Sequence, residues 1–154
     1  MPPRRVILTV VTLFALLHLY IGLRLLPAMP LGSSGLAVGV ALLAASALLV
    51  PAGLLVSRVK QTRWSDRLAW AGLLAMGLFS SLLILTLLRD VTLALLAAIG
   101  AGREAIDSGS AIGVPVLAFA VTLIGLVNAR RVAKVVEVEV PIADLPAAFH
   151  GYSI

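Results

Sequence analysis

His18 is the side chain that comes closest to a chemical role, because it lies inside a long apolar stretch. An ionisable residue at membrane depth is by default a candidate for proton transfer or ligand binding. The alternative is a neutral histidine that hydrogen-bonds a neighbouring helix, and we prefer this structural interpretation. The second histidine, His150, lies far away in the C-terminal tail, and the chain has no cysteine. Two distant histidines without thiolates do not predict a metal site.

Arg24, Arg89 and Asp90 form a second group, each near the end of an apolar stretch. A charged side chain close to hydrocarbon either pairs with an opposite charge or extends toward the lipid headgroups. An ion pair between Asp90 and Arg24, joining two helices, is one expectation. Separate extension of each side chain toward the interface is the interpretation that we prefer.

The carboxylates do not predict an active site. The aspartates lie in different loops and helix ends, at Asp66, Asp90, Asp107 and Asp144. No pair of carboxylates shares a helical face with a histidine, and the sequence has no nucleophile elbow, P-loop or glycine-rich phosphate cradle. We therefore assign no catalytic, cofactor-binding or metal-binding residue in this chain.

The composition is that of a membrane protein. Of 154 residues, 61% are hydrophobic and 12% are charged, and the mean hydropathy is +1.12. Soluble domains carry about 25% charged residues. Four apolar segments approach the ~20 residues that a membrane-spanning helix needs, and they cover residues 6–26, 36–56, 68–88 and 111–127. A shorter apolar run, Val91–Ile99, either prolongs the third helix or lies flat on the membrane.

The basic residues predict the topology and explain the net charge of +5. Nine of the twelve Lys and Arg residues fall on one side of the membrane if both termini face the cytoplasm, in accord with the positive-inside rule. The other three are Arg24, Arg89 and Arg103. Trp64 and Trp70 flank the start of the third span, where aromatic rings anchor helices at the interface. No basic face interleaved with aromatic residues indicates nucleic-acid binding.

Small residues and prolines predict features of the packing. Small-xxx-small pairs allow close helix approach within the bundle or in a homodimer; they are Gly35/Gly39, Ala41/Ala45, Ala71/Ala75 and Gly77/Ser81. Pro51 is expected to kink the second span. Pro115 is expected in the first turn of the fourth helix, where proline is tolerated.

The C-terminal residues differ in character from the spans. Alternating Val and Glu in Val135–Val140 predicts a β-strand with one solvated face. A single strand is not stable alone, so we expect residues 132–154 to be a juxtamembrane tail that begins a further cytoplasmic domain. The expected fold is an all-α integral membrane protein, with a four-helix transmembrane domain at residues 1–131 and a short β-type tail that is mobile on its own.

The tail carries a family resemblance. Asn128-Ala129-Arg130-Arg131, Val136-Glu137-Val138, Val140-Pro141 and Leu145–Ile154 resemble a junction in bacterial membrane-bound calcineurin-like metallophosphoesterases. In that family a four-helix membrane region precedes a Val-Glu-Val-Pro strand, a Leu-Pro-x-x-x-x-Gly turn and an Asp-x-His motif that opens a two-metal site. This chain ends at Ile154, before such a motif, so no metal ligand of the family can be placed on it.

The resemblance implies a function outside the spans. It implies a membrane-anchoring module of a metal-dependent phosphoesterase in the bacterial inner membrane, with a Mn, Fe or Zn pair only in the absent catalytic domain. The lipid bilayer is the expected partner. The alternative is a stand-alone small polytopic membrane protein with an assembly or transport role.

Overall fold

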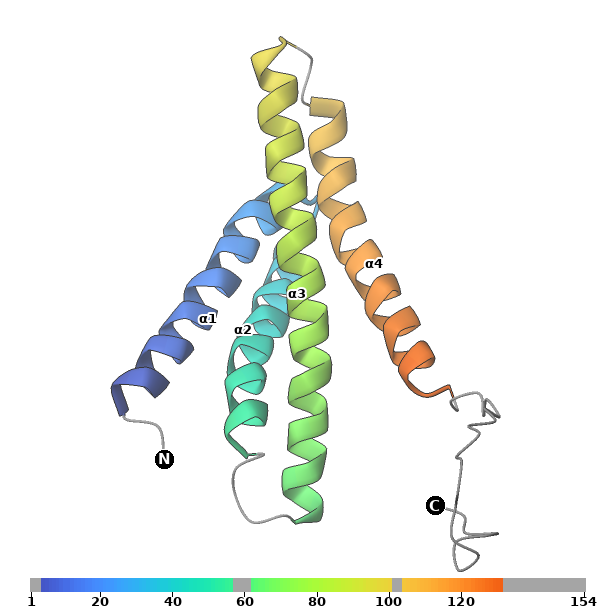
Figure 1. Ribbon diagram of the computed structural model, residues 1–154. Helices are drawn as coiled ribbons and strands as arrows, with labels where there is room; N and C mark the ends of the chain where they lie inside the picture. The colour runs from blue at the N-terminus through green and yellow to red at the C-terminus, as the bar shows by residue number, and fades with distance from the viewer. Residues whose placement is uncertain (1–3, 57–61, 101–103, 132–154) are drawn as a thin grey trace, which may run out of the picture.

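The computed structural model describes residues 4–56, 62–100 and 104–131 of the chain. In these residues the chain forms four long helices and one short 3₁₀ helix and contains no strand (Figure 1). The helices are α1 (Arg4–Leu25), η1 (Leu26–Ala28), α2 (Ser33–Val56), α3 (Arg63–Ala98) and α4 (Glu104–Ala129). The predicted β-type tail, with His150 and Asp144, lies outside the described residues.

All four long helices are long and apolar enough to cross a membrane. Their outward faces carry exposed leucine, valine and isoleucine side chains, such as Leu8, Leu48 and Ile84. In water such a surface would be unfavourable, whereas in a bilayer it contacts hydrocarbon. Helices also suit a bilayer because their backbone hydrogen bonds form within each segment. The described architecture thus agrees with the predicted all-α membrane bundle.

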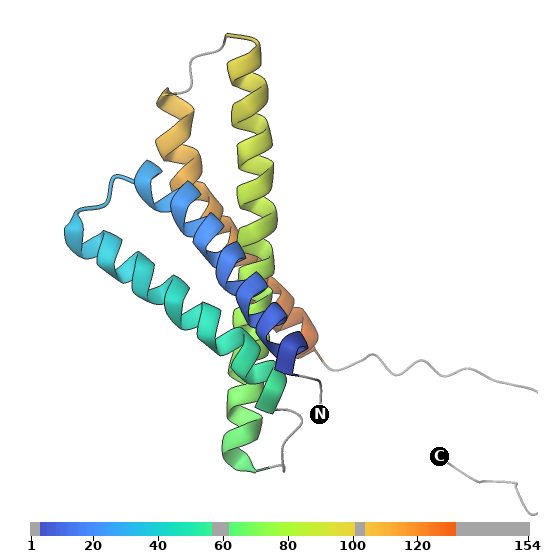
Figure 2. The same cartoon turned by 90° about the vertical axis from the view of Figure 1, so that its left-hand side faces the viewer.

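α1 and α2 form a helical hairpin. The chain leaves α1 through η1, which has Pro27 in its first positions, and α2 begins at Ser33. Proline fits there because its fixed backbone angle suits the first turn of a helix and its missing N–H is not needed. The connection between α1 and α2 is therefore part 3₁₀ helix and part loop (Figure 2).

α3 is the longest helix and begins with a capping box. The Thr62 side chain accepts a hydrogen bond from the Ser65 backbone N–H, and the Ser65 side chain accepts one from the Thr62 backbone. The helix then continues without interruption through Arg89 and Asp90 to Ala98. The run after Asp90 therefore prolongs the third helix, which is one of the two alternatives that the sequence left open.

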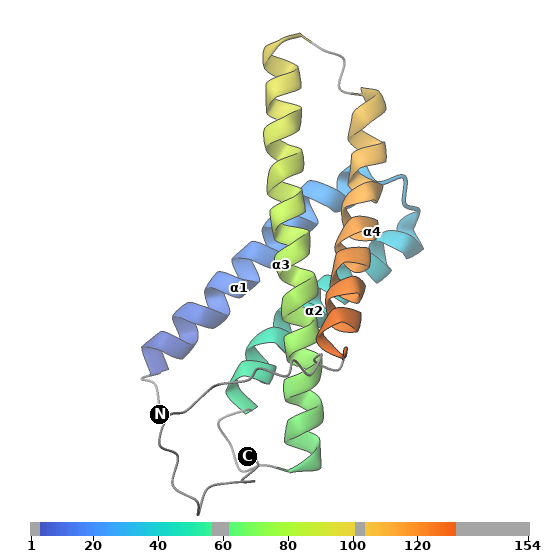
Figure 3. The same cartoon turned by 45° about the vertical axis from the view of Figure 1, so that its right-hand side comes forward.

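The length of α3 exceeds the hydrocarbon layer. Its 36 residues correspond to about 54 Å at 1.5 Å per residue, against about 30 Å of hydrocarbon. The upper parts of α3 and α4 accordingly extend past the α1–α2 turn (Figures 2 and 3). Gly100 follows α3 with φ at 71°, a left-handed conformation that suits glycine at a helix end.

α4 begins earlier than its apolar run predicts. The helix starts at Glu104, seven residues before the expected span, so Pro115 lies well inside it and the expectation of a first-turn proline is wrong. The reason is that apolar residues mark the depth of the hydrocarbon, whereas a helix continues wherever polar residues can also form it. Pro51 lies inside α2, as expected, and is buried.

α3 packs against each of the other three helices (Figures 1 and 3). A small apolar core joins them, with Ile21 and Leu25 from α1, Phe79 from α3 and Val114 from α4. Ile21 and Leu25 are four residues apart and so lie on one face of α1, as expected for an inward-facing helical stripe.

α2 and α3 approach each other closely at Gly53 and Gly72. A Cβ atom built on Gly53 would lie 2.7 Å from the Cα of Gly72, so the two backbones touch where they cross. The small-xxx-small pairs did not identify this crossing. Of the predicted pairs, Ala41 and Ala45 are exposed on the outer face of α2.

Candidate functional site

One end of the helices is basic. The start of α1, the end of α2, the start of α3 and the end of α4 all lie at this end, which is the lower end in Figure 1. We call it the basic end. Eight Lys and Arg residues are described and six of them lie here; they are Arg4, Arg5, Arg63, Arg67, Arg130 and Arg131. The other two, Arg24 and Arg89, lie toward the opposite end.

Trp64 and Trp70 lie at the basic end, near the start of α3. The guanidinium carbon of Arg67 is 5.7 Å from the Trp64 ring centroid, and that of Arg130 is 5.2 Å from the Trp70 ring centroid. Each distance falls within the range of a cation–π contact. The two predicted interface anchors are therefore each paired with an arginine, and the second pair ties the end of α4 to α3.

A network of charged and polar side chains joins α1, α3 and α4 toward the opposite end. We call it the charged cluster; its members are Tyr20, Arg24, Arg89, Asp90, Asp107 and Ser110. Within it, Asp90 accepts hydrogen bonds from the Tyr20 hydroxyl and from Nε of Arg24, both at 2.6 Å. The predicted ion pair between Arg24 and Asp90 is thus present, and the preferred expectation of separate side chains is wrong for these two.

Arg89 is the buried centre of the charged cluster, with 4% of its side chain exposed. Its Nη2 contacts the carboxylate of Asp107 and donates to the Asp107 carbonyl at 3.0 Å, and its Nε donates to Ser110 Oγ at 3.0 Å. Its Nη1 donates to the Arg24 carbonyl at 3.4 Å. A guanidinium withdrawn from water is costly unless its donors are satisfied, and here each nitrogen has a partner.

Two arginines and two aspartates balance in the charged cluster. Oδ1 of Asp90 accepts no hydrogen bond within the described residues, but it lies 3.6 Å from Nη1 of Arg89. The cluster therefore holds three helices together with no net charge. Sequence reasoning found three members and missed Tyr20, Asp107 and Ser110 as partners. The contacts of Asp107 and Ser110 depend on α4 starting before its apolar run, and that of Tyr20 depends on how α1 packs against α3.

His18 is buried between α1, α2 and α3. Its Nδ1 lies 2.7 Å from the Phe14 carbonyl oxygen and its Nε2 lies 3.1 Å from Ser46 Oγ on α2. A carbonyl can only accept, so Nδ1 carries the proton and, in the neutral ring, Nε2 accepts from the serine hydroxyl. The ring also stacks on Phe79 of α3, with centroids 4.4 Å apart.

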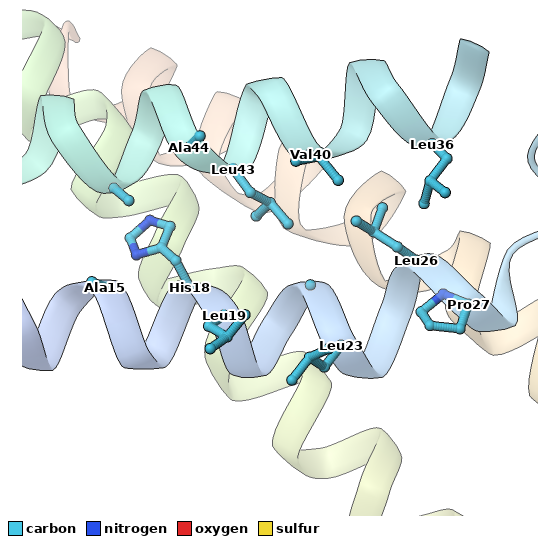
Figure 4. Close-up of a pocket in the computed structure, with 12 residues that line it drawn as sticks. Ala15, His18, Leu19, Leu23, Leu26, Pro27, Leu36, Val40, Leu43 and Ala44 are labelled. Atoms are coloured by element: carbon cyan, nitrogen blue, oxygen red, sulfur yellow. The ribbon is translucent and has the colours of Figure 1, made fainter. Parts of the chain in front are cut away.

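The surroundings of His18 agree with the preferred structural interpretation. Both ring nitrogens have hydrogen-bond partners, and Ser46 belongs to a neighbouring helix, as predicted. Figure 4 shows the ring beside a cavity of about 410 Å³ between α1 and α2, whose other lining residues are apolar, among them Leu19, Leu23 and Leu43. Within the described residues, no hydrogen bond joins His18 to the charged cluster.

The described residues do not gather a set of metal-ligating side chains. Among residues 4–56, 62–100 and 104–131, no three His, Asp or Glu side chains come together. His18 and Asp66 lie in different environments, the first buried and the second exposed.

No protein family, curated protein or solved structure matches this chain.

Proposed function

We propose that the four helices form a membrane anchor with both termini in the cytoplasm of a bacterial cell, spanning the plasma membrane. The arginine distribution is the observation that carries this proposal. Six of the eight described basic residues lie at the basic end, and the remaining two have carboxylate partners in the charged cluster. Unpaired positive charge is retained on the cytoplasmic side of membrane proteins, which assigns the basic end to that side.

The interior of the bundle favours an anchor over a transporter. Transport of protons or ions uses polar side chains distributed along a path through several helices. Here His18 is held by Phe14 and Ser46, and the core around it is made of Ile21, Phe79 and other apolar side chains. These contacts support a role in packing.

We further propose that the anchor belongs to a metal-dependent phosphoesterase. Support comes from the resemblance of residues 128–154 to the junction that precedes the catalytic domain in membrane-bound calcineurin-like metallophosphoesterases. α4 ends at the basic end, so a domain that followed would lie at the cytoplasmic face. A stand-alone polytopic protein with an assembly or transport role is the alternative.

Reporter fusions test the topology. Fusions of alkaline phosphatase or green fluorescent protein placed after Arg131 and within residues 57–61 should give the cytoplasmic signal, and one after Gly100 should give the external signal. Gly100 is a suitable fusion site because it follows α3 and precedes α4, whose Asp107 contacts Arg89. A cytoplasmic signal after Gly100 would contradict the assigned orientation.

The coding sequence beyond the codon for Ile154 tests the phosphoesterase. An in-frame continuation with an Asp-x-His motif, together with Mn²⁺-dependent phosphodiester hydrolysis by membranes containing the whole product, is the expected result. A stop codon directly after Ile154 would contradict the catalytic part and favour the stand-alone alternative.

A further inference from the structure

A hollow of about 610 Å³ opens at the basic end, where α2 ends and α3 begins. Its walls include Val56 from α2 and Trp64, Arg67, Leu68 and Ala71 from α3. The volume falls in the range of roughly 300–1,000 Å³ typical of small-molecule sites. Among the described residues, the lining therefore combines a cation, an indole and aliphatic side chains with the hydroxyl residues Thr62 and Ser65 of the α3 cap.

The α3 wall of the hollow changes character with depth. Trp64, Arg67, Leu68 and Ala71 share one helical face, because they are spaced at i, i+3, i+4 and i+7. Ala71 lies about 10 Å further along the axis than Trp64 at 1.5 Å per residue. The wall is therefore aromatic and cationic at Trp64 and Arg67 and aliphatic at Leu68 and Ala71. A phospholipid changes from a charged phosphate to an apolar acyl chain in the same direction.

Arg67 is available to an anion. Its guanidinium lies over the Trp64 ring, and within the described part of the chain no carboxylate lies within ion-pair distance of it. Trp64 itself is 77% exposed. Arg24 and Arg89 differ, because each already contacts an aspartate in the charged cluster.

We propose that this hollow binds one anionic phospholipid. The phosphate contacts the Arg67 guanidinium, the glycerol region lies beside the Trp64 indole, and an acyl chain packs on Leu68 and Ala71 against Val56. Charge complementarity selects an anionic headgroup over a zwitterionic one. The proposal rests on the membrane-embedded part of the proposed function and is independent of the phosphoesterase.

Tryptophan fluorescence can test the site, because the chain has two tryptophans. The Trp70→Phe variant leaves Trp64 as the sole reporter. The variant is reconstituted into phosphatidylcholine vesicles that contain a minor fraction of phosphatidylglycerol or phosphatidylcholine brominated near the headgroup end of the acyl chain. We expect phosphatidylglycerol to occupy the shell around Trp64 about fivefold in preference, the gain from one basic residue at an anionic surface.

Arg63 provides the matched control. Both Arg63→Gln and Arg67→Gln, made in the Trp70→Phe background, remove one positive charge from the first turns of α3, but Arg63 does not line the hollow. The site requires Arg67→Gln to lose most of the preference for phosphatidylglycerol and Arg63→Gln to keep most of it. Equal losses would indicate diffuse surface charge and would overturn the proposal, as would equal quenching by the two brominated lipids.

Two further measurements show whether the bound phosphate belongs to a lipid and whether the chain is inserted in the vesicles. Unbrominated phosphatidylglycerol should relieve the quenching, whereas soluble glycerol phosphate should not; relief by the soluble compound would overturn a lipid site. Flotation of the vesicles checks insertion. A chain that floats but shows no lipid preference overturns only the lipid site, and a chain that does not float overturns both this proposal and the membrane anchor.

Discussion

The crossing of α2 over α3 at Gly53 and Gly72 gives the sharpest prediction of stability. In the Gly72→Ala variant the new methyl group would lie 2.6 Å from the Cα of Gly53 and 2.9 Å from the Leu49 carbonyl oxygen. Ordinary contact begins at 3.4 Å, so the backbones must separate by about 0.8 Å, the difference between 3.4 and 2.6 Å. Neither contact atom is the end of a flexible side chain, and α2 must move as a unit.

The expected cost of Gly72→Ala is that of overpacking, about 1–3 kcal/mol. Alanine also favours the helix over glycine by about 0.5–1 kcal/mol, and a control variant must cancel this gain. Gly125→Ala serves this purpose, because Gly125 lies in α4 with no atom within 4 Å of the new methyl group. The free energy of unfolding of Gly72→Ala should therefore fall below that of Gly125→Ala by about 1–3 kcal/mol.

A third variant separates backbone contact from side-chain contact. In Gly39→Ala the methyl group would meet Cδ2 of Leu26 at 2.6 Å, and this flexible side chain can rotate away. Its stability should fall between those of the other two variants. The assay is equilibrium unfolding by increasing sodium dodecyl sulfate in mixed micelles, followed by circular dichroism. Equal stability of Gly72→Ala and Gly125→Ala would refute the close crossing.

Two further variants test the polar contacts by the same unfolding assay. Asp90→Asn should lower the free energy of unfolding by about 1–2 kcal/mol, because interhelical hydrogen bonds in membranes are worth about that much or less and Asp90 accepts from both Tyr20 and Arg24. An unchanged stability would contradict the network. His18→Leu should lower the free energy of unfolding by about 1 kcal/mol or less, because it removes the hydrogen bond with Ser46 but keeps an apolar side chain against Phe79. A loss comparable to the whole stability would contradict a packing role.

The spans could be predicted from sequence because hydrophobic length alone decides them. Four segments with few charges and about twenty apolar residues have no alternative state in lipid other than helix. The helix ends could not be placed equally well. The fourth span was expected to begin at residue 111, yet α4 begins at Glu104, and Asp107 and Ser110 gain partners by being helical beside Arg89.

The side-chain contacts show the same limit. His18 was expected to bond a neighbouring helix, which the Ser46 contact confirms, but nothing in the sequence identifies Ser46 as the partner. The crossing of Gly53 and Gly72 involves two glycines outside the four predicted small-xxx-small pairs, so its existence depends on how the two helices are oriented. Register between helices is a property of the whole bundle and is not encoded in any local pattern.

The position of α3 has a consequence for how the bundle is completed. Without α3, the contact between α1 and α2 would include the hydrogen bond that the Ser46 hydroxyl donates to Nε2 of His18. The glycine surface at Gly53, the ring surface of His18 and the carboxylate that Arg24 contacts are all completed by residues of α3. The α1–α2 hairpin alone therefore lacks these three completing contacts, and α3 is the element on which the tertiary structure of the described residues depends.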